Sequence, residues 1–454
     1  AAFWHKDNDL GNDIQKEEYP DSRDVEPKKE SDDSLVIHGS VENTVDISLE
    51  ECMKFALGNN PRIQAAMQDV FASDARIRQV WASYFPQFGW QTKQLQLSDA
   101  LGRNLTFNYW VLGQISASQM LYDFGVTQNQ VTIRKLDSQG YKITLTGTVN
   151  DVLCEVKKSY YYLQYAIEDM VAKYAAFYDQ AKAFYKVGTK PKVDVTIAEV
   201  NLSNAKLNLI QAENAVDIAM AKLNNTMGLP YSNKYKVTET LRYEPCDITL
   251  DRAIKTAQTS RPEFQLAEVK VEEAKQNVKL VKKSYFPQLT IEGQYQIGGS
   301  HPTSNYGYNY GGYLNFPTIN GMLIKNEIKE AQALYSREQS NAINTKNNIY
   351  YEIQESYYSL TEKKNKIPVA FLGLKQAKEN YELSYGRYKV GVGNPIELKD
   401  AQVQYQNAML TYYQTMYDYN AAKATLEKSI GKNIANGEVE LKEGCSKKKI
   451  KKNS

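Results

Sequence analysis

Two carboxylates beside a short glycine-containing turn are the side chains whose type and spacing point most directly to chemistry. Glu397 and Asp400 are three residues apart and follow Asn394 and Pro395. Asparagine can cap a helix and proline fits its first position, so both acids are predicted on one helix face. Symmetric copies of such acids could form a ring that binds cations and gates passage. Helix capping explains the same acids without any ion, because negative charge near a helix N-terminus favours the helix dipole.

An earlier turn repeats this pattern. The tetrapeptide Tyr-Lys-Val-Gly occurs at residues 185–188 and again at 388–391, and Asp194 follows the first copy as Glu397 follows the second. Long helical patterns lead into both turns and shorter ones lead out of them. The outgoing patterns cover about 126–187 and about 322–390, and the returning patterns cover about 193–227 and about 395–430.

The two turns belong to a duplicated chain. The pentapeptide Ser-Tyr-Phe-Pro-Gln occurs at 83–87 and at 284–288, an offset of 201 residues (284 minus 83), and Pro61 meets Pro262 at the same offset. Because proline disrupts a helix interior and favours extended geometry in the residue before it, each pentapeptide is predicted to join a helix to a strand. The sequence therefore predicts two structural repeats.

Helix lengths indicate how each repeat is arranged. Ser48 with Glu51 is the pattern of a capping box and predicts a short helix that ends near Asn60. A second helix is predicted from Pro61 to about Ser83. The pre-hinge helix and the returning helix together match the length of the outgoing helix. We therefore expect these two to stack end to end beside it.

After each hinge there is room for two strands. Apolar residues alternate with polar ones in each repeat, which is the pattern of a strand with one apolar face; they are Leu105, Phe107, Tyr109, Val111, Ile115 and Ala117, then Leu289, Ile291, Tyr295 and Ile297. Such a sheet could pack on helices in a soluble protein or form part of a membrane barrel. Four strands cannot close alone, and an open edge is not tolerated in lipid. Two chains would give eight strands and three would give twelve, and periodicity does not choose between them.

Composition excludes several classes of protein. The chain has 454 residues, 42% of them hydrophobic, and a formal net charge of +2, so no strong field points to nucleic acid. Three scattered histidines match no metal-ligand spacing, and no phosphate loop or nucleophile motif occurs. We expect no enzyme activity, no metal and no cofactor. The four cysteines could be free thiols or one or two disulfides.

The order and duplication of several short motifs resemble the TolC family of outer-membrane efflux ducts. The resemblance covers about residues 47–431. The motifs that carry it are Asn60-Pro61, the two hinges, the strand exits Gln119–Gly125 and Asn315–Gly321, and the two Tyr-Lys-Val-Gly turns.

The resemblance implies a mainly α-helical chain with a membrane β-barrel portion. Three chains would form a twelve-stranded β-barrel continuous with a long α-helical barrel in the periplasm. The homotrimer would dock a periplasmic adaptor and, through it, an inner-membrane pump. The gate residues implied are Asp194, Tyr388, Glu397 and Asp400, and the adaptor-docking residues are Val187, Gly188, Val390 and Gly391. Gly393 stands where some members carry a gate arginine.

The predicted division of the chain combines these patterns. It comprises a charged arm (1–44), a first repeat (45–228, with a hairpin at about 85–121 and a tip at about 187–193), a mid-rod connector (229–247), a second repeat (248–431, with a hairpin at about 286–317 and a tip at about 390–396) and a lysine-rich tail (432–454). The function implied is a passive exit duct for efflux or type I secretion in the outer membrane of a diderm bacterium. The alternative is a soluble, elongated coiled-coil scaffold or adhesin with a small β docking module. The sequence does not identify the cargo.

Overall fold

The computed structural model describes residues 45–98, 106–170, 192–230, 235–237, 241–243, 245–246, 248–299, 305–317, 322–390 and 392–431. All of them belong to the unit that begins at Val45. The charged arm, the turn residues Val187, Gly188 and Gly391, and the lysine-rich tail lie outside these ranges. Within the described helices, none is both long and apolar enough to cross a membrane.

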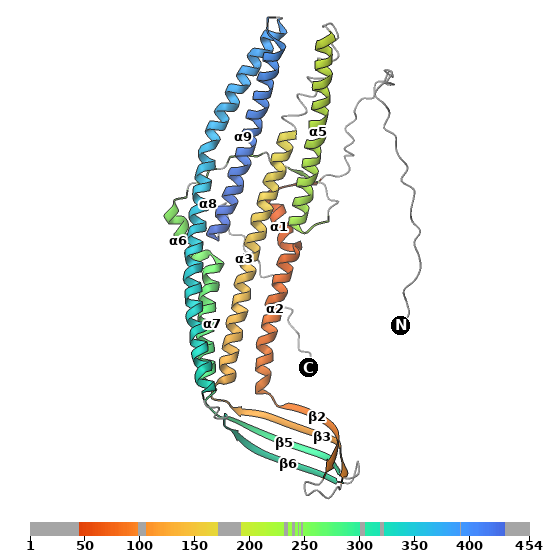
Figure 1. The fold of residues 1–454 in the computed structure, drawn as a ribbon, viewed down its shortest axis with the longest axis vertical. Helices are drawn as coiled ribbons and strands as arrows, with labels where there is room; N and C mark the ends of the chain where they lie inside the picture. Colours follow the sequence, from red (N-terminus) through yellow and green to blue (C-terminus); the bar gives the residue numbers. More distant parts are fainter. Residues whose placement is uncertain are drawn as a thin grey trace, which may run out of the picture. The chain divides into compact units, whose positions relative to one another are not determined.

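Two sets of elements follow the same order along the chain: a short strand, two helices, a β-hairpin, a long outgoing helix and a returning helix (Figure 1). The first set comprises β1 (Val45–Ile47), α1 (Leu49–Asn59), α2 (Pro61–Trp81), the 3-10 turn η1 (Ala82–Tyr84), β2 (Gln87–Ser98), β3 (Thr106–Tyr122), α3 (Val126–Asp169) and α5 (Lys192–Met227). The second comprises β4 (Tyr235–Val237), α6 (Leu250–Ser260), α7 (Pro262–Lys283), β5 (Gln288–Gly299), β6 (Asn305–Asn315), α8 (Leu323–Lys389) and α9 (Pro395–Ile430). The predicted duplication is confirmed.

Helix starts follow the local sequence. The Glu51 N–H donates to the Ser48 hydroxyl, and the Ser48 N–H donates to the Glu51 carboxylate at 2.9 Å, which confirms the predicted capping box. The hydrogen bond from the Ser48 N–H, followed by that from its hydroxyl, lowers the pKa of the Glu51 carboxyl. Pro61 and Pro262 start α2 and α7, where a missing N–H has no cost.

A glycine joins α5 to the start of α2, and we call this contact the first joint. Gly228 has φ +72°, and a Cβ added there would lie 2.6 Å from the carbonyl oxygen of Asn59. The side-chain amide of Asn60 donates to the carbonyl of Thr226 at 2.8 Å, while its oxygen accepts from the N–H of Arg62 at 2.8 Å. Only glycine fits this close approach of two helix ends.

The second joint connects α9 to the start of α7 in the same way. Gly431 has φ +75°, and an added Cβ would lie 2.8 Å from the Cα of Arg261. Arg261 Nη1 donates to the carbonyl of Ser429 at 3.2 Å. The two joints place each returning helix on the end of a pre-hinge helix.

The long helices run beside these stacked pairs. In the first repeat α3 packs against α2 and α5, and in the second α8 packs against α7 and α9. The predicted end-to-end stacking is therefore confirmed. Helix α3 also packs against α7 and α9 of the second repeat, so it lies at the seam between the repeats (Figure 1).

The four long strands form one antiparallel sheet in the order β2-β3-β5-β6. The sheet follows the ends of α2 and α7 and precedes α3 and α8 (Figure 1). A separate parallel pair joins β1 to β4, with Ile47 opposite Val237. That pairing joins the first strand of the second set to the first strand of the first set.

The register gives the sheet two chemically different faces. Directly paired residues share a face. One face carries exposed large apolar side chains: Phe88, Trp90, Ile115, Ile291, Tyr295, Tyr306, Tyr308 and Tyr310. The other carries small and polar residues: Gln87, Gln91, Gln114, Ser116, Ser118, Glu292, Gln294 and Gln296. The predicted alternation of β5 is thus confirmed.

The alternation predicted through β3 is wrong at Val111. Ile115 pairs with Tyr295, but Val111 pairs with Gly298, which lies on the opposite face of β5. The register shifts between Val111 and Gly113, so one extra residue interrupts the period of two. Val111 is consequently buried at 1% exposure, whereas Ile115 is exposed. Leu105 lies outside the described residues, and the side chains of Phe107 and Tyr109 are not described.

Candidate functional site: the turn between α8 and α9

The turn that follows α8 folds back on a single carbonyl group. The N–H groups of Val392 and Gly393 both donate to the carbonyl of Arg387 at 3.0 Å. A Cβ added at Gly393 would lie 2.7 Å from the backbone nitrogen of Tyr388. No side chain fits there without a shift of the backbone, which explains why residue 393 is glycine rather than the gate arginine that the resemblance would place there.

Helix α9 begins as the sequence predicted. The side-chain oxygen of Asn394 accepts the N–H of Ile396 at 3.0 Å, and Pro395 takes the first helical position. Glu397 follows in the first turn, where the helix dipole favours its charge. Its carboxylate is held by another side chain, because Arg387 Nη1 lies 3.3 Å from Glu397 Oε1.

The two predicted acids lie on the exposed side of α9. Glu397 and Asp400 are exposed, whereas Leu398 and Ala401 are buried. The spacing of three residues thus places both carboxylates away from the packed face of the helix. Their proximity on one face agrees with the prediction from sequence.

The other predicted residues are placed unequally. Tyr388 is partly buried in the last turn of α8, and the side chain of Val390 is 74% exposed. Asp194 lies in the first turn of α5, and its side chain is not described. Val187, Gly188 and Gly391 lie outside the described ranges. Whether the first turn approaches the second stays a prediction.

Arg387 is the residue of this turn that the sequence analysis missed. The sequence could have indicated it, because a cation in the last turn of one helix and an acid in the first turn of the next both interact favourably with the helix dipoles. A tight antiparallel turn brings these two helix ends together. The motif therefore contains a cation as well as two acids.

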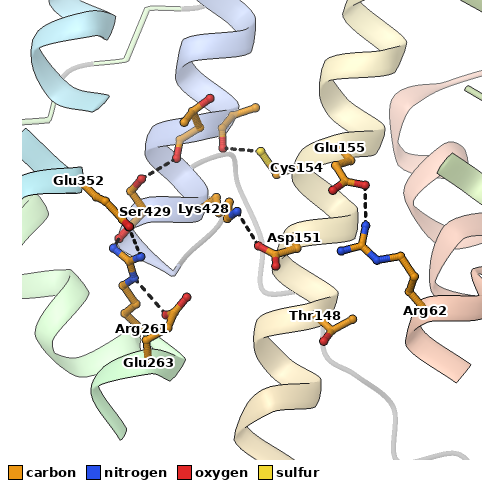
Figure 2. A network of polar contacts seen from close by, with 12 residues as sticks. Arg62, Thr148, Asp151, Cys154, Glu155, Arg261, Glu263, Glu352, Lys428 and Ser429 are labelled. Carbon is orange, nitrogen blue, oxygen red and sulfur yellow. Dashed lines mark hydrogen bonds and ion pairs between the residues drawn. The ribbon is translucent and has the colours of Figure 1, made fainter. Parts of the chain in front are cut away.

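A polar network crosses the seam between the repeats (Figure 2). Lys157 of α3 and Glu427 of α9 form a buried ion pair at 2.5 Å. Lys428 Nζ lies 2.7 Å from Asp151 Oδ1, and the Cys154 thiol donates to the carbonyl of Ala424 at 3.4 Å. These contacts fix the register of α3 against α9.

Three cysteines in the described ranges are buried free thiols: Cys52, Cys154 and Cys246. Burial raises the pKa of the Cys52 thiol to about 12 and also raises that of Cys154. Protonated thiols of this kind are packing groups rather than nucleophiles. In the same ranges, no three or more His, Cys, Asp or Glu side chains lie together as a metal site would require.

Two known proteins are similar to this chain in sequence. The chain is 21% identical over 403 residues to toxin and drug export protein A of Aggregatibacter actinomycetemcomitans, covering 85% of this chain and 86% of that one. It is 23% identical over 314 residues to the outer membrane protein TolC of Vibrio cholerae, covering 66% and 70%.

Solved structures of two outer membrane channels resemble this fold. The CmeC channel of Campylobacter jejuni superposes with a TM-score of 0.72 at 16% identity, covering 88% of this chain and 90% of that one. The MtrE channel of Neisseria gonorrhoeae, in its open state, superposes with a TM-score of 0.71 at 15% identity, covering 86% and 90%.

One family model matches both repeats. It is described as outer membrane efflux protein, and it covers residues 53–229 and 253–432. The matched segments contain the two joints, the sheet and the turn between α8 and α9. The chain therefore belongs to the outer membrane efflux protein family.

Proposed function

We propose that three copies of this chain form a passive exit duct in the outer membrane, opened at the helical tip by a periplasmic adaptor. The observation that carries this proposal is the two-faced sheet. Its exposed apolar face suits lipid, and its opposite face of glutamine, serine and glutamate suits a wet lumen. A soluble sheet would need a cover for the apolar side chains.

The edges of the sheet call for partner copies. In the described residues β2 and β6 pair on one side only. Unpaired backbone groups are not tolerated in lipid, so β6 of one copy would pair with β2 of the next. Three copies would close twelve strands. The repeats would then supply helices for a periplasmic tube.

Aromatic side chains mark where the strands meet the helices. Amphipathic aromatic rings collect at the boundary between lipid and water, so this level would lie at the periplasmic surface of the membrane. The Phe124 ring stacks on Phe286 with centroids 5.2 Å apart, which links the two repeats there. The exposed aromatics at this level are Trp81, Tyr84, Phe85, Tyr122, Phe124, Tyr285, Phe286 and Phe316.

The turn between α8 and α9 would form the closed end of the duct. Glu397 and Asp400 would supply an acidic constriction, and Asp194 and Tyr388 would make closing contacts. An adaptor would dock on the turns through Val187, Gly188, Val390 and Gly391. Untwisting of the tip helices would open the constriction, and an inner-membrane pump would supply the energy.

Single-channel conductance in a planar bilayer tests the duct and its gate separately. The purified chain should give small cation-selective currents that divalent cations block. Replacing both acids, Glu397→Ala with Asp400→Ala, should enlarge the currents and relieve the block. If the substitution leaves the currents and their block unchanged, the two acids serve only to stabilise the start of the helix. If the chain instead forms an oligomer that is soluble without detergent and does not insert into the bilayer, the proposed duct is wrong.

A further inference from the structure

We propose that Arg387 sets the charge of the tip constriction by neutralising Glu397, so that Asp400 carries the uncompensated negative charge. This inference deepens the acidic constriction and rests on it. The direct observation is the contact of 3.3 Å between Arg387 Nη1 and Glu397 Oε1. It assigns unequal roles to two acids that the sequence presents as a pair.

The turn fixes the origin of the Arg387 side chain. Its carbonyl accepts the N–H groups of both Val392 and Gly393, and Gly393 packs its backbone against Tyr388. The guanidinium leaves from the last turn of α8 and meets an acid in the first turn of α9. Both helix dipoles favour this arrangement, so the pair is held by geometry as well as by charge.

Glu397 and Asp400 differ in their surroundings. The pair of Arg387 and Glu397 is partly solvated, with side chains 61% and 46% exposed. Asp400 is exposed and makes no ion pair with another described residue. Each chain would thus present one uncompensated carboxylate instead of two. Because the Debye length is about 10 Å at 0.1 M salt, removal of the guanidinium would act on cations in the opening.

The test is divalent block of single channels for the variant Arg387→Gln. Freeing Glu397 should lower the magnesium concentration that gives half-maximal block by about fivefold. A change of this size is expected when a partly solvated ion pair is lost. The Arg387→Lys variant keeps the positive charge, so magnesium should block its channel as it blocks the channel of the unmodified protein. Lys389→Gln removes an exposed cation two residues away and is the matched control.

The Glu397→Gln background isolates the pair. There, Arg387→Gln should strengthen the block by much less than fivefold, because it frees no carboxylate for the cation. An equal increase in that background, or an equal increase from Lys389→Gln, would mean a general charge effect and would overturn the inference. If Glu397→Gln weakens the block but Arg387→Gln does nothing, the constriction stands and the inference fails. If neither acid affects the block, the proposed constriction fails first.

Discussion

The first and second joints use one backbone solution with different side chains. In both, a glycine with positive φ ends the returning helix against the residue before a proline. At the first joint a neutral amide, Asn60, bridges the helix ends. At the second the bridge is the buried guanidinium of Arg261.

The guanidinium reaches further than the amide. Arg261 contacts the carbonyl of Ser429 on α9, Glu352 on α8 and Glu263 on α7 (Figure 2). It thereby ties three helices at the base of the hairpin whose far end is the candidate gate. The comparison teaches that duplication preserves the backbone geometry of a joint, while its chemistry diverges.

A second difference lies where α3 separates the pre-hinge helices. On α2, the Asp74 carboxylate accepts from the Ser138 hydroxyl at 2.6 Å, which lowers the pKa of Asp74. On α7, burial and then the nearby charge of Asp137 raise the pKa of Glu273. Adjacent residues of α3 therefore favour the charge of one acid and oppose that of the other.

The largest expected effect comes from the joint glycines. Gly228→Ala and Gly431→Ala should each lower the unfolding free energy by about 3 kcal/mol, because the strain of alanine at positive φ adds to the clash of its Cβ with the backbone. Thermal unfolding in detergent measures both. Gly386→Ala is the control: its added Cβ meets nothing within 4 Å inside α8, so it should stabilise slightly. A large loss at only one joint would show that the two backbones are not equivalent.

The next effect separates the bridging side chains. Arg261→Ala should lower the unfolding free energy by about 2 kcal/mol, since it removes buried packing and several hydrogen bonds. Asn60→Ala should cost about 1 kcal/mol, the usual loss of a helix cap. Arg261→Asn should fall between Arg261→Ala and the unmodified chain, because asparagine can cap α7 without reaching Glu352. Equal losses for both alanine variants would contradict the comparison.

Substitution of Glu273 should have a smaller effect on stability, and this effect should depend on pH. Because its folded pKa is raised, the unfolded chain releases this proton first, and stability falls as pH rises above the unfolded value of about 4.3. Glu273→Gln should therefore raise the melting temperature at pH 7. The gain should vanish below about pH 4. A gain that persists in acid would assign the effect to packing.

Asp74 should show the opposite sign and the smallest effect. Its folded pKa is lowered, so its contribution is present above the unfolded value and is lost as pH falls through the folded value. Asp74→Asn should destabilise the protein at pH 7 by less than about 1 kcal/mol, since the group is partly solvated. The same melting curves, repeated in acid, should converge with those of the unmodified chain.

Local rules predicted much of this fold from sequence. The hinges, the capping box at Ser48, the proline starts and the duplication all follow from residues close together in the chain. The extra residue near Leu112 in β3 was not predicted, because the register of β3 depends on its pairing with β5 rather than on the local sequence pattern.

Contacts between distant residues could not be read from periodicity. Arg261 precedes a proline and resembles an exposed loop cation, yet it is buried against helices 91 and 168 residues further along. At the candidate site the acids followed from spacing, but Arg387 required knowledge of how the turn folds back. The parallel pairing of β1 with β4 escaped for the same reason.

The seam pair of Lys157 and Glu427 has a consequence for the order of folding. The two residues are 270 positions apart, so a chain made from its N-terminus contains Lys157 long before it contains Glu427. Helix α9 packs on the face of α3 that carries Lys157, so the native packing of that face forms only once α9 has been made. Helix α9 is thus needed to complete the core: a chain interrupted before it leaves this face of α3 uncovered and open to proteolysis.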